Sequence, residues 1–324
     1  MAVNPSFLRQ RLEFAFPTAE AHSGIPLSNG TFGALLWGEG RRLRLTLNRA
    51  DYSLLGDEPP IEPGAPPPMG RLDLVLPLDW SPVSGGLHLA TGEAELELEG
   101  HRVNGKLRTT LLRDRDVLCL RITGIAGADV KLENRPPDAS DVLERFRSLG
   151  LPKAECFDLG EFGGWVQECP GKLALCVGWL RHVTAGGLLL FITAVYGTGP
   201  AEARRQALQT LESVSSEGYT PATLRSFSAW RKWWERAPGG SDPTSRLLGQ
   251  LRSYRLAEPG TQDETATPAL AEDGYSIEGR GTGEVALLRN GKEVGTFTLV
   301  PLCLEGDAAR GHKREPRAYR SPFE

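Results

Sequence analysis

Hydrophobic and polar residues alternate with a period of two along several segments in the first two-thirds of the chain. Residues 42–48 place leucines at every second position, and residues 93–99 alternate glutamate with alanine or leucine. This alternation is typical of antiparallel strands with one buried face and one solvated face. Further strands are predicted at residues 32–37, 71–78, 117–122, 172–179 and 188–196. Because Gly/Pro turns separate these strands, we predict a mainly β fold, a large antiparallel β-sandwich (a supersandwich) over residues 1–198.

The pattern changes to a helical period after residue 199. A helix is predicted at residues 200–213, with Pro200 at its first position, and a second at residues 220–236. Apolar residues recur at spacings of three and four in the second helix, which gives it an aromatic face with Trp230, Trp233 and Trp234. With a third helix predicted at residues 242–256, residues 199–257 form a helical linker region. A short helix is also predicted at residues 138–149 within the β region.

The final part of the chain returns to a β pattern. Residues 258–273 are polar and are interpreted as a linker, and residues 274–304 as a small C-terminal β segment with strands at 275–277, 284–289 and 293–300. The Asn290-Gly291 pair between two apolar runs predicts a hairpin turn, because a type I′ turn needs positive φ at both central positions. The polar tail 305–324 is expected to be disordered, and the proline-rich stretch 57–70 to be an extended loop.

Composition and charge narrow the class of protein. The 324 residues include 37 lysines and arginines and 41 aspartates and glutamates, which gives a net charge of −4. The composition therefore lacks the excess of basic residues that is typical of nucleic-acid-binding proteins. Residues 1–13 lack the apolar core of a secretory signal, and the most apolar stretch, 173–196, is too interrupted to span a membrane. We therefore predict a cytoplasmic protein with no nucleic-acid or membrane partner.

No motif indicates a metal or a cofactor. The cysteines show no CxxC spacing, and the histidines show neither HxxxH nor HxH spacing. Residues 279–283 are glycine-rich but lack the lysine and the following helix of a phosphate-binding loop. We predict that the protein uses no cofactor and no metal, and that its cysteines are reduced and buried.

Two motifs and one helical segment resemble a known family. Residues 25–38 read I-P-L-S-N-G-T-F-G-A-L-L-W-G, which resembles the segment P-L-G-N-G-x-L-G-A-x-x-x-G of glycoside hydrolase family 95 and its family 65 relatives. Residues 43–52 are similar to the family stretch L-x-L-N-x-x-x-x-W. Residues 201–211 and 228–234 resemble the helical linker with its H-x-x-W-W-x-x-F-W motif, although Ser28, Ser228 and Arg231 depart from the family pattern.

This resemblance implies the N-terminal β-sandwich domain and helical linker of such a hydrolase. In the family the linker leads into an (α/α)6 barrel that carries the catalytic carboxylates, and no position of this sequence matches them. After Ala257 too few residues remain for twelve helices of about 11 residues each. The expectation is a shortened, family 95-like protein that lacks the barrel and is not catalytic alone, so no catalytic residue is assigned.

The resemblance suggests that Ser28, Asn29 and Gly30 form a barrel-facing or substrate-proximal loop, whereas ordinary turn chemistry explains the same residues. Asp158 and Glu161, near Trp165, are weak carbohydrate candidates because acids beside aromatic rings can bind a sugar; a turn between strands explains them equally well. The glutamates at 93, 95, 97 and 99 are predicted to form a solvated strand surface, since nothing in the sequence implies burial of one of them.

Two other functions remain open. The first is a carbohydrate-binding or assembly module, in which exposed Trp37, Trp80 or Trp165 stacks on sugar, or a protein partner docks on the helix of Trp230, Trp233 and Trp234. The second is an active glycosidase with an unrecognised carboxylate pair, for instance near Asp158 and Glu161. If the barrel is missing, at least one of the three helix tryptophans should stay exposed, because each loses a covering neighbour.

Overall fold

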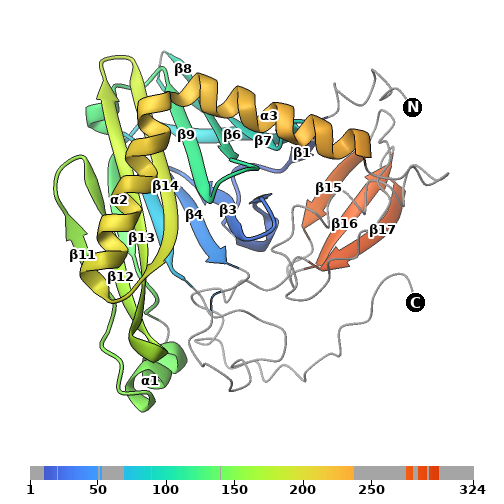
Figure 1. The fold of residues 1–324 in the computed structure, drawn as a ribbon. Helices are drawn as coiled ribbons and strands as arrows, with labels where there is room; N and C mark the ends of the chain where they lie inside the picture. The colour runs from blue at the N-terminus through green and yellow to red at the C-terminus, as the bar shows by residue number, and fades with distance from the viewer. Residues whose placement is uncertain are drawn as a thin grey trace.

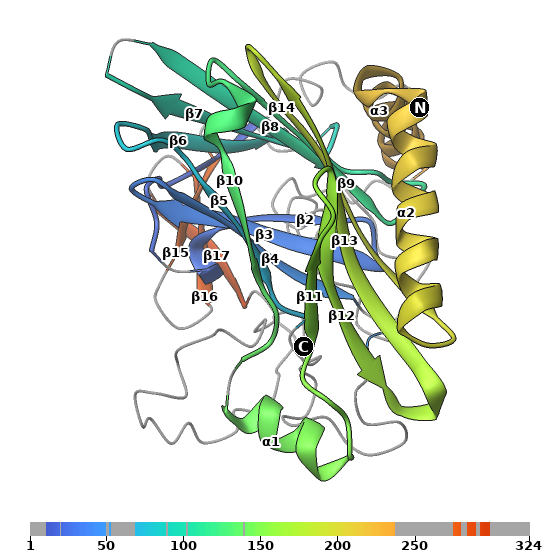
Figure 2. The ribbon, with the colours of Figure 1, turned by 90° about the vertical axis from the view of Figure 1, so that its left-hand side faces the viewer.

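The computed structural model describes residues 11–19, 21–49, 52, 69–88, 90–101, 103–138, 140–236, 275–279, 284–289 and 292–298. Within these residues the fold is mainly β and consists of two large sheets, with helices packed on one side of the larger sheet (Figures 1 and 2). The predicted fold class, an antiparallel β-sandwich followed by helices and a small β segment, is confirmed.

In the described part of the chain the larger sheet has twelve strands, and the neighbours pair antiparallel except for the parallel pair β1–β15. In spatial order the strands are β11 (Glu155–Asp158), β12 (Phe162–Cys169), β13 (Leu173–Thr184), β14 (Gly187–Gly197), β9 (Val117–Thr123), β8 (Asn104–Leu111), β7 (Glu93–Glu99), β6 (Ser81–His88), β1 (Arg11–Phe14), β15 (Tyr275–Gly279), β16 (Glu284–Arg289) and β17 (Lys292–Thr298). The predicted C-terminal strands therefore extend the sandwich sheet.

The smaller sheet has five strands in the described residues and is antiparallel throughout. Their order is β10 (Lys131–Arg135), β5 (Arg71–Val75), β4 (Arg42–Arg49), β3 (Phe32–Glu39) and β2 (Ile25–Ser28). Leu43, Leu45 and Leu47 of β4 are fully buried, as their alternation predicts. They belong to the main core, which Leu96 and Leu107 line from the larger sheet.

Three α-helices occur in the described residues: α1 (Ser140–Ser148), α2 (Pro200–Glu217) and α3 (Tyr219–Arg236). Short 3-10 turns lie at η2 (Ala21–Ser23), η3 (Gly127–Asp129) and η4 (Pro170–Lys172). Helix α2 buries its apolar face, Ala203, Ala207, Leu211 and Val214, against a second core cluster. That cluster lies on the side of β13 and β14 away from the smaller sheet (Figures 1 and 2). Helix α2 ends at Gly218, which has a φ of 91°.

Several strands were missed by the sequence pattern. Strand β6 contains Pro82, Gly85 and Gly86, a composition that favours a loop. The glycines are needed because neighbouring side chains cross them: a Cβ on Gly85 would lie 2.6 Å from the Phe16 ring, and one on Gly86 would lie 2.1 Å from Arg11 Nε. In the same way Gly163 lies within β12 against the Trp179 ring, where a Cβ would lie 2.3 Å from a ring carbon.

The hairpin prediction at Asn290-Gly291 is confirmed for its strands. Strands β16 and β17 pair antiparallel, with Arg289 opposite Lys292. The two turn residues themselves lie outside the described residues, as do the helix predicted at 242–256, the linker 258–273 and the tail 305–324.

Candidate functional site

The Ser28-Asn29-Gly30 segment is the tight connection between β2 and β3. The Asn29 side-chain oxygen accepts hydrogen bonds from the backbone N–H groups of Thr31 at 3.0 Å and Phe32 at 2.9 Å. The Ser28 hydroxyl accepts one from the Gly30 N–H at 3.0 Å, and Gly30 has a φ of 102°. These contacts form the turn that the residue types predict, because Gly tolerates positive φ and short polar side chains bond the backbone locally.

The amide nitrogen of Asn29 joins this turn to the distant β8–β9 connection. It donates to the carbonyl oxygens of Leu112 and Arg115, both at 3.2 Å, and to Asp116 Oδ1 at 2.9 Å. Arg113 donates from its guanidinium to the Asn29 carbonyl and, through its backbone N–H, to Ser226 Oγ on α3 at 3.0 Å. Asn29 therefore ties the two sheets together at the edge where α3 packs.

A buried arginine completes this connection. Arg49, at the end of β4, donates from Nη1 to Asp116 Oδ2 at 2.8 Å and to the Ala194 carbonyl at 2.6 Å. Its guanidinium carbon lies 5.7 Å from the centroid of the Tyr196 ring. The Asp116 backbone carbonyl in turn accepts the Thr193 hydroxyl at 2.6 Å. Both polar ends of the Asn29 amide are thus engaged within the protein, which supports a structural role for this turn.

The three carbohydrate candidates Asp158, Glu161 and Trp165 do not form one site. The interpretation of Trp165 as an exposed ring is wrong: it is 1% exposed, lies in the main core and donates from Nε1 to the Met69 carbonyl at 2.9 Å. Asp158 Oδ1 accepts the Gly160 N–H at 2.9 Å, a turn contact. Glu161 is exposed in the connection between β11 and β12. Asp158 and Glu161 therefore sit at a strand turn.

The other proposed sugar-stacking rings are also covered. Trp37 is 9% exposed, and Trp80 is half-buried, close to Gly100 and Gly105. On α3, Trp230 is 1% exposed and packs on Gly92, where a Cβ would lie 2.7 Å from the indole Nε1. The side chains of Trp233 and Trp234 lie outside the described residues, so the predicted exposed tryptophan on this helix stays a prediction for those two positions.

The glutamates of β7 are not the uniformly solvated surface that the sequence predicts. Glu95 is 8% exposed and accepts from Arg108 Nε at 2.7 Å and Lys106 Nζ at 3.2 Å. Burial by itself raises the pKa of Glu95, but the hydrogen bonds from Arg108 and Lys106 outweigh it, and the pKa is lowered. Burial raises the pKa of Glu93, two residues earlier on the same face. Glu93 and Glu95 are buried because side chains from other strands, such as Arg108 and Lys106 of β8, lie against this face of β7. The local strand pattern does not reveal such contacts.

The most concentrated polar group lies on the outer face of the five-stranded sheet, the side opposite the core. Since alternate strand residues share a face, the polar or aromatic residues of this face include Trp37, Arg42, Arg44, Thr46, Arg71, Asp73, Glu133 and Arg135. In register, Trp37 lies opposite Arg44, Arg44 opposite Asp73, and Asp73 opposite Glu133. One row across four strands therefore reads Trp, Arg, Asp, Glu.

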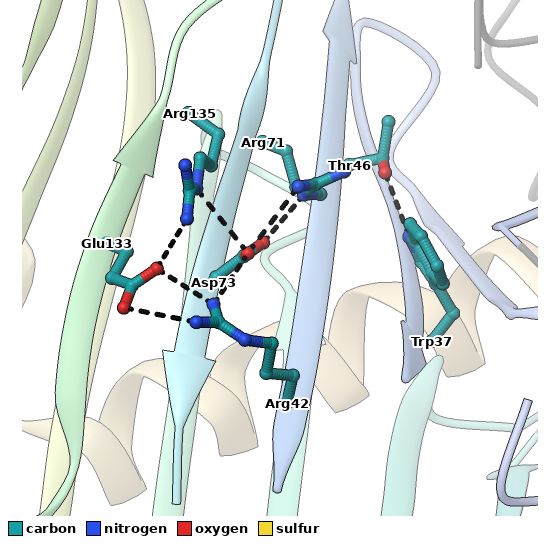
Figure 3. A network of polar contacts seen from close by, with 7 residues as sticks. All are labelled: Trp37, Arg42, Thr46, Arg71, Asp73, Glu133 and Arg135. Atoms are coloured by element: carbon teal, nitrogen blue, oxygen red, sulfur yellow. Dashed lines mark hydrogen bonds and ion pairs between the residues drawn. The ribbon is translucent and has the colours of Figure 1, made fainter. Parts of the chain in front are cut away.

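Asp73 is the centre of this face, and its side chain is 2% exposed (Figure 3). Its carboxylate accepts Arg71 Nε at 2.6 Å and lies 3.4 Å from Arg42 Nη1 and 3.7 Å from Arg135 Nε. Glu133 accepts Arg42 at 2.8 Å and Arg135 at 2.7 Å. The hydrogen bond that Arg42 donates to Glu133 lowers the pKa of Glu133 and raises the pKa of Arg42. Two carboxylates thus hold three arginines.

Trp37 borders the charged row and is fixed in orientation. Its indole Nε1 donates to Thr46 Oγ1 on β4 at 2.9 Å (Figure 3). The guanidinium carbons of Arg44 and Arg71 lie 4.6 Å and 5.7 Å from the ring centroid, within cation–π range. Burial lowers the pKa of Arg44; Asp73 opposes this shift, and the neighbouring charge of Arg71 adds to it.

This outer face was not predicted, although the sequence carries a signal for it. The segments R-L-R-L-T and R-L-D-L-V alternate leucine with charged residues, and only the leucine face was interpreted.

No group of three or more His, Cys, Asp or Glu residues suited to a metal ion occurs in the described part of the chain. Among the same residues, no helix is long and apolar enough to cross a membrane.

No protein-family model matches the chain, and no curated protein matches it. Among solved structures, a chain described as a kojibiose phosphorylase from the human microbiome is similar over 70% of this chain and 35% of its own length. The TM-score is 0.42 and the sequence identity 14%. The match spans little more than a third of that protein, and the proposals below stand on the residues of this chain.

Proposed function

We propose that this chain is a glycoside-hydrolase-related β-sandwich module that recognises carbohydrate and does not cleave glycosidic bonds by itself. The relation to family 95 and family 65 hydrolases is supported by the motif at residues 25–38 and the similar stretch at 43–52. Most of β2, β3 and β4 falls within these segments. Strands β3 and β4 therefore belong both to the resemblance and to the candidate site, whereas β5 and β10 belong to the site alone.

The observation that carries the recognition proposal is the chemistry of the outer face. It offers many N–H donors in fixed positions: the Arg42 and Arg135 guanidinium groups are held by Glu133, and Trp37 supports Arg44. Large apolar side chains that are exposed in the described residues lie elsewhere: Leu78, Val83, Val103, Leu159, Leu173, Val183 and Leu224. A polar, donor-rich face suits a hydroxyl-rich ligand better than a protein partner, whose interface needs an apolar centre.

The proposal that the module is not catalytic rests on the carboxylates. Glycoside hydrolysis requires two carboxyl groups across a substrate-sized gap, one of them with a raised pKa. Asp158 is engaged in a turn, and Glu95 is buried in ion pairs with Arg108 and Lys106. Glu93 has a raised pKa, but the neighbouring carboxylate on its face is Glu95, which these ion pairs already hold. The alternative of an active glycosidase is therefore best tested at Glu93 and Glu95.

A panel of aryl glycosides tests the catalytic part, and a panel of immobilised glycans tests the recognition part. We expect no turnover above that of buffer, and binding to at least one glycan that is weakened by the substitution D73N. Turnover that survives purification and is lost in E93Q or E95Q would overturn the non-catalytic proposal. Absence of binding to every glycan would overturn the recognition proposal.

An assembly role has less support. It depends on an exposed tryptophan face on α3, whereas Trp230 is buried against Gly92. Light scattering of the purified chain checks this alternative, and we expect a monomer.

A further inference from the structure

The charges on the outer face do not balance. Arg42, Arg44, Arg71 and Arg135 face two carboxylates, Asp73 and Glu133. At the margins of the same face, Glu39 and Lys131 add one charge of each sign. Counted over the described residues, the face therefore carries a surplus of two positive charges, on a chain whose net charge is −4. Such a surplus at one place favours an anionic ligand.

Among the described arginines of this face, Arg44 makes no ion pair with a described acidic residue. Asp73 lies opposite it on β5, but the Asp73 carboxylate is taken by Arg71, Arg42 and Arg135. Within the described residues, no carboxylate oxygen lies in ion-pair distance of the Arg44 guanidinium, and none of its N–H donors makes a hydrogen bond. The Arg44 guanidinium is half-buried, and its N–H donors are not used within the described residues, so they are available to a ligand that supplies acceptors.

The donors of Arg44 are nevertheless held in place. Its guanidinium lies over the Trp37 ring at 4.6 Å, and that ring is fixed by the hydrogen bond to Thr46. Arg71 approaches the same ring at 5.7 Å, so two guanidinium groups gather at one indole. Because Arg44 and Arg71 cover it and it is 9% exposed, Trp37 acts as a support for the guanidinium groups. An arginine fixed in this way loses little side-chain entropy when it binds a carboxylate through two parallel hydrogen bonds.

We propose that the outer face binds an acidic carbohydrate, with a uronate carboxylate seated on Arg44. This inference rests on the proposed carbohydrate recognition and names the ligand class of that same site. A carboxylate can accept two parallel hydrogen bonds from the planar guanidinium of Arg44, and its negative charge neutralises half of the surplus charge. The hydroxyl groups of neighbouring sugar units then meet the polar row of Thr46, Arg71 and Arg135, on which no large apolar side chain is exposed.

The test measures the affinity of the purified full chain for an oligogalacturonate and for a neutral galacto-oligosaccharide of equal length by calorimetry. The variants are Arg44→Gln, which removes both the positive charge and the paired N–H donors of the guanidinium, and Arg44→Lys, which keeps only the charge. The matched control is Arg121→Gln, an exposed arginine of β9 on the other sheet. We expect oligogalacturonate binding that falls about tenfold or more in R44Q, falls less in R44K and is unchanged in R121Q.

Other outcomes separate this inference from the proposed function. Equal binding of the neutral sugar, or equal losses in R44Q and R121Q, overturns the acidic-ligand inference and leaves carbohydrate recognition standing. Binding to neither sugar overturns the inference, and binding to no glycan in the wider panel overturns the proposed function as well. Tighter binding of polyglutamate than of oligogalacturonate, with the same dependence on Arg44, overturns the assignment to a saccharide. Near-ultraviolet circular dichroism confirms that each variant is folded before its affinity is compared.

Discussion

The amide nitrogen of Asn29 lies 2.9 Å from Asp116 Oδ1, although 87 positions separate the two residues in the sequence. Asp116 Oδ2 also accepts a hydrogen bond from Nη1 of Arg49, at the end of β4, at 2.8 Å. The β2–β3 turn, the β8–β9 connection and the end of β4 therefore meet at one carboxylate. Since Arg113 of the same connection bonds Ser226, α3 is anchored through this point too.

Replacing Asn29 with alanine should destabilise the fold strongly. The substitution N29A removes the acceptor for two backbone N–H groups and the donor to three oxygens, and leaves some of those buried groups unpaired. We expect a loss of about 2–4 kcal/mol in the free energy of unfolding, measured by urea denaturation. Asn104→Ala, at an exposed position of β8, is the control and should change stability by less than about 0.5 kcal/mol. Equal effects of the two substitutions would show that Asn29 is not a connecting residue.

The two carboxylates of the outer face should differ in their contribution to stability. Asp73 is 2% exposed and Glu133 is 34% exposed by side chain, although both contact arginines. We expect D73N to lower the free energy of unfolding by about 2–3 kcal/mol because it removes the buried negative charge that Arg42, Arg71 and Arg135 contact. The exposed pair is screened by solvent, so E133Q should cost about 1 kcal/mol or less. Chemical denaturation of both variants checks the order, and a larger loss in E133Q would contradict it.

The stability of the protein should depend on pH through Glu93. Burial raises its pKa in the folded state above the ordinary value of 4.5. Below that value Glu93 is protonated in both states and has no effect. As the pH rises, the unfolded chain loses the proton first while the folded chain still holds it, so stability falls until the folded pKa is passed. Glu93→Gln should therefore gain stability relative to the wild type as the pH rises above 4.5, until the folded-state pKa of Glu93 is passed.

Denaturation midpoints of E93Q and the wild type at several pH values measure this difference. Glu99→Gln, exposed on the same strand, should show no such trend. The neighbours Arg108, Glu95, His88 and Tyr219 remain the same in both proteins, so their own titration largely cancels in the comparison. A difference between E93Q and the wild type that does not change with pH would refute the assignment.

The thiols should react in an order set by burial. Cys119 and Cys176 are buried, which raises the pKa of each to about 12, and burial raises the pKa of Cys169 to about 11. Cys156 is exposed on β11. In a Cys303→Ser background, iodoacetamide should modify Cys156 well before the other three, because the thiolate is the reactive form and must be accessible. Peptide mass spectrometry measures the order of modification. Early modification of Cys119 would contradict the prediction. In urea, which unfolds the protein, the difference in reactivity should disappear.

Much of the fold follows from local pattern. The alternating leucines of β4, the existence of strand β7 and the start of the helix at Pro200 agree with the sequence pattern, because each depends on a period of two or of 3.6 residues. Strand β6 was missed because Pro82, Gly85 and Gly86 resemble a loop, and the glycines are explained only by Phe16 and Arg11, which cross them from elsewhere in the fold. The prediction of an exposed Trp165 is wrong because the sequence does not reveal that the Met69 carbonyl accepts its indole N–H within the core.

The sequence by itself determined which residues alternate in each strand, where glycine allows a turn such as that at Gly30, and that the fold is mainly β. Only the tertiary structure decided which faces are covered and which side chains meet. The order of strands β3, β4, β5 and β10 brings Trp37, Arg44, Asp73 and Glu133 into one row, although the first and last are far apart in the chain. The physical reason is that a strand pattern reports only that a face exists. Its partners, and hence the surplus charge at Arg44 and the burial of Glu93, depend on non-local strand pairing.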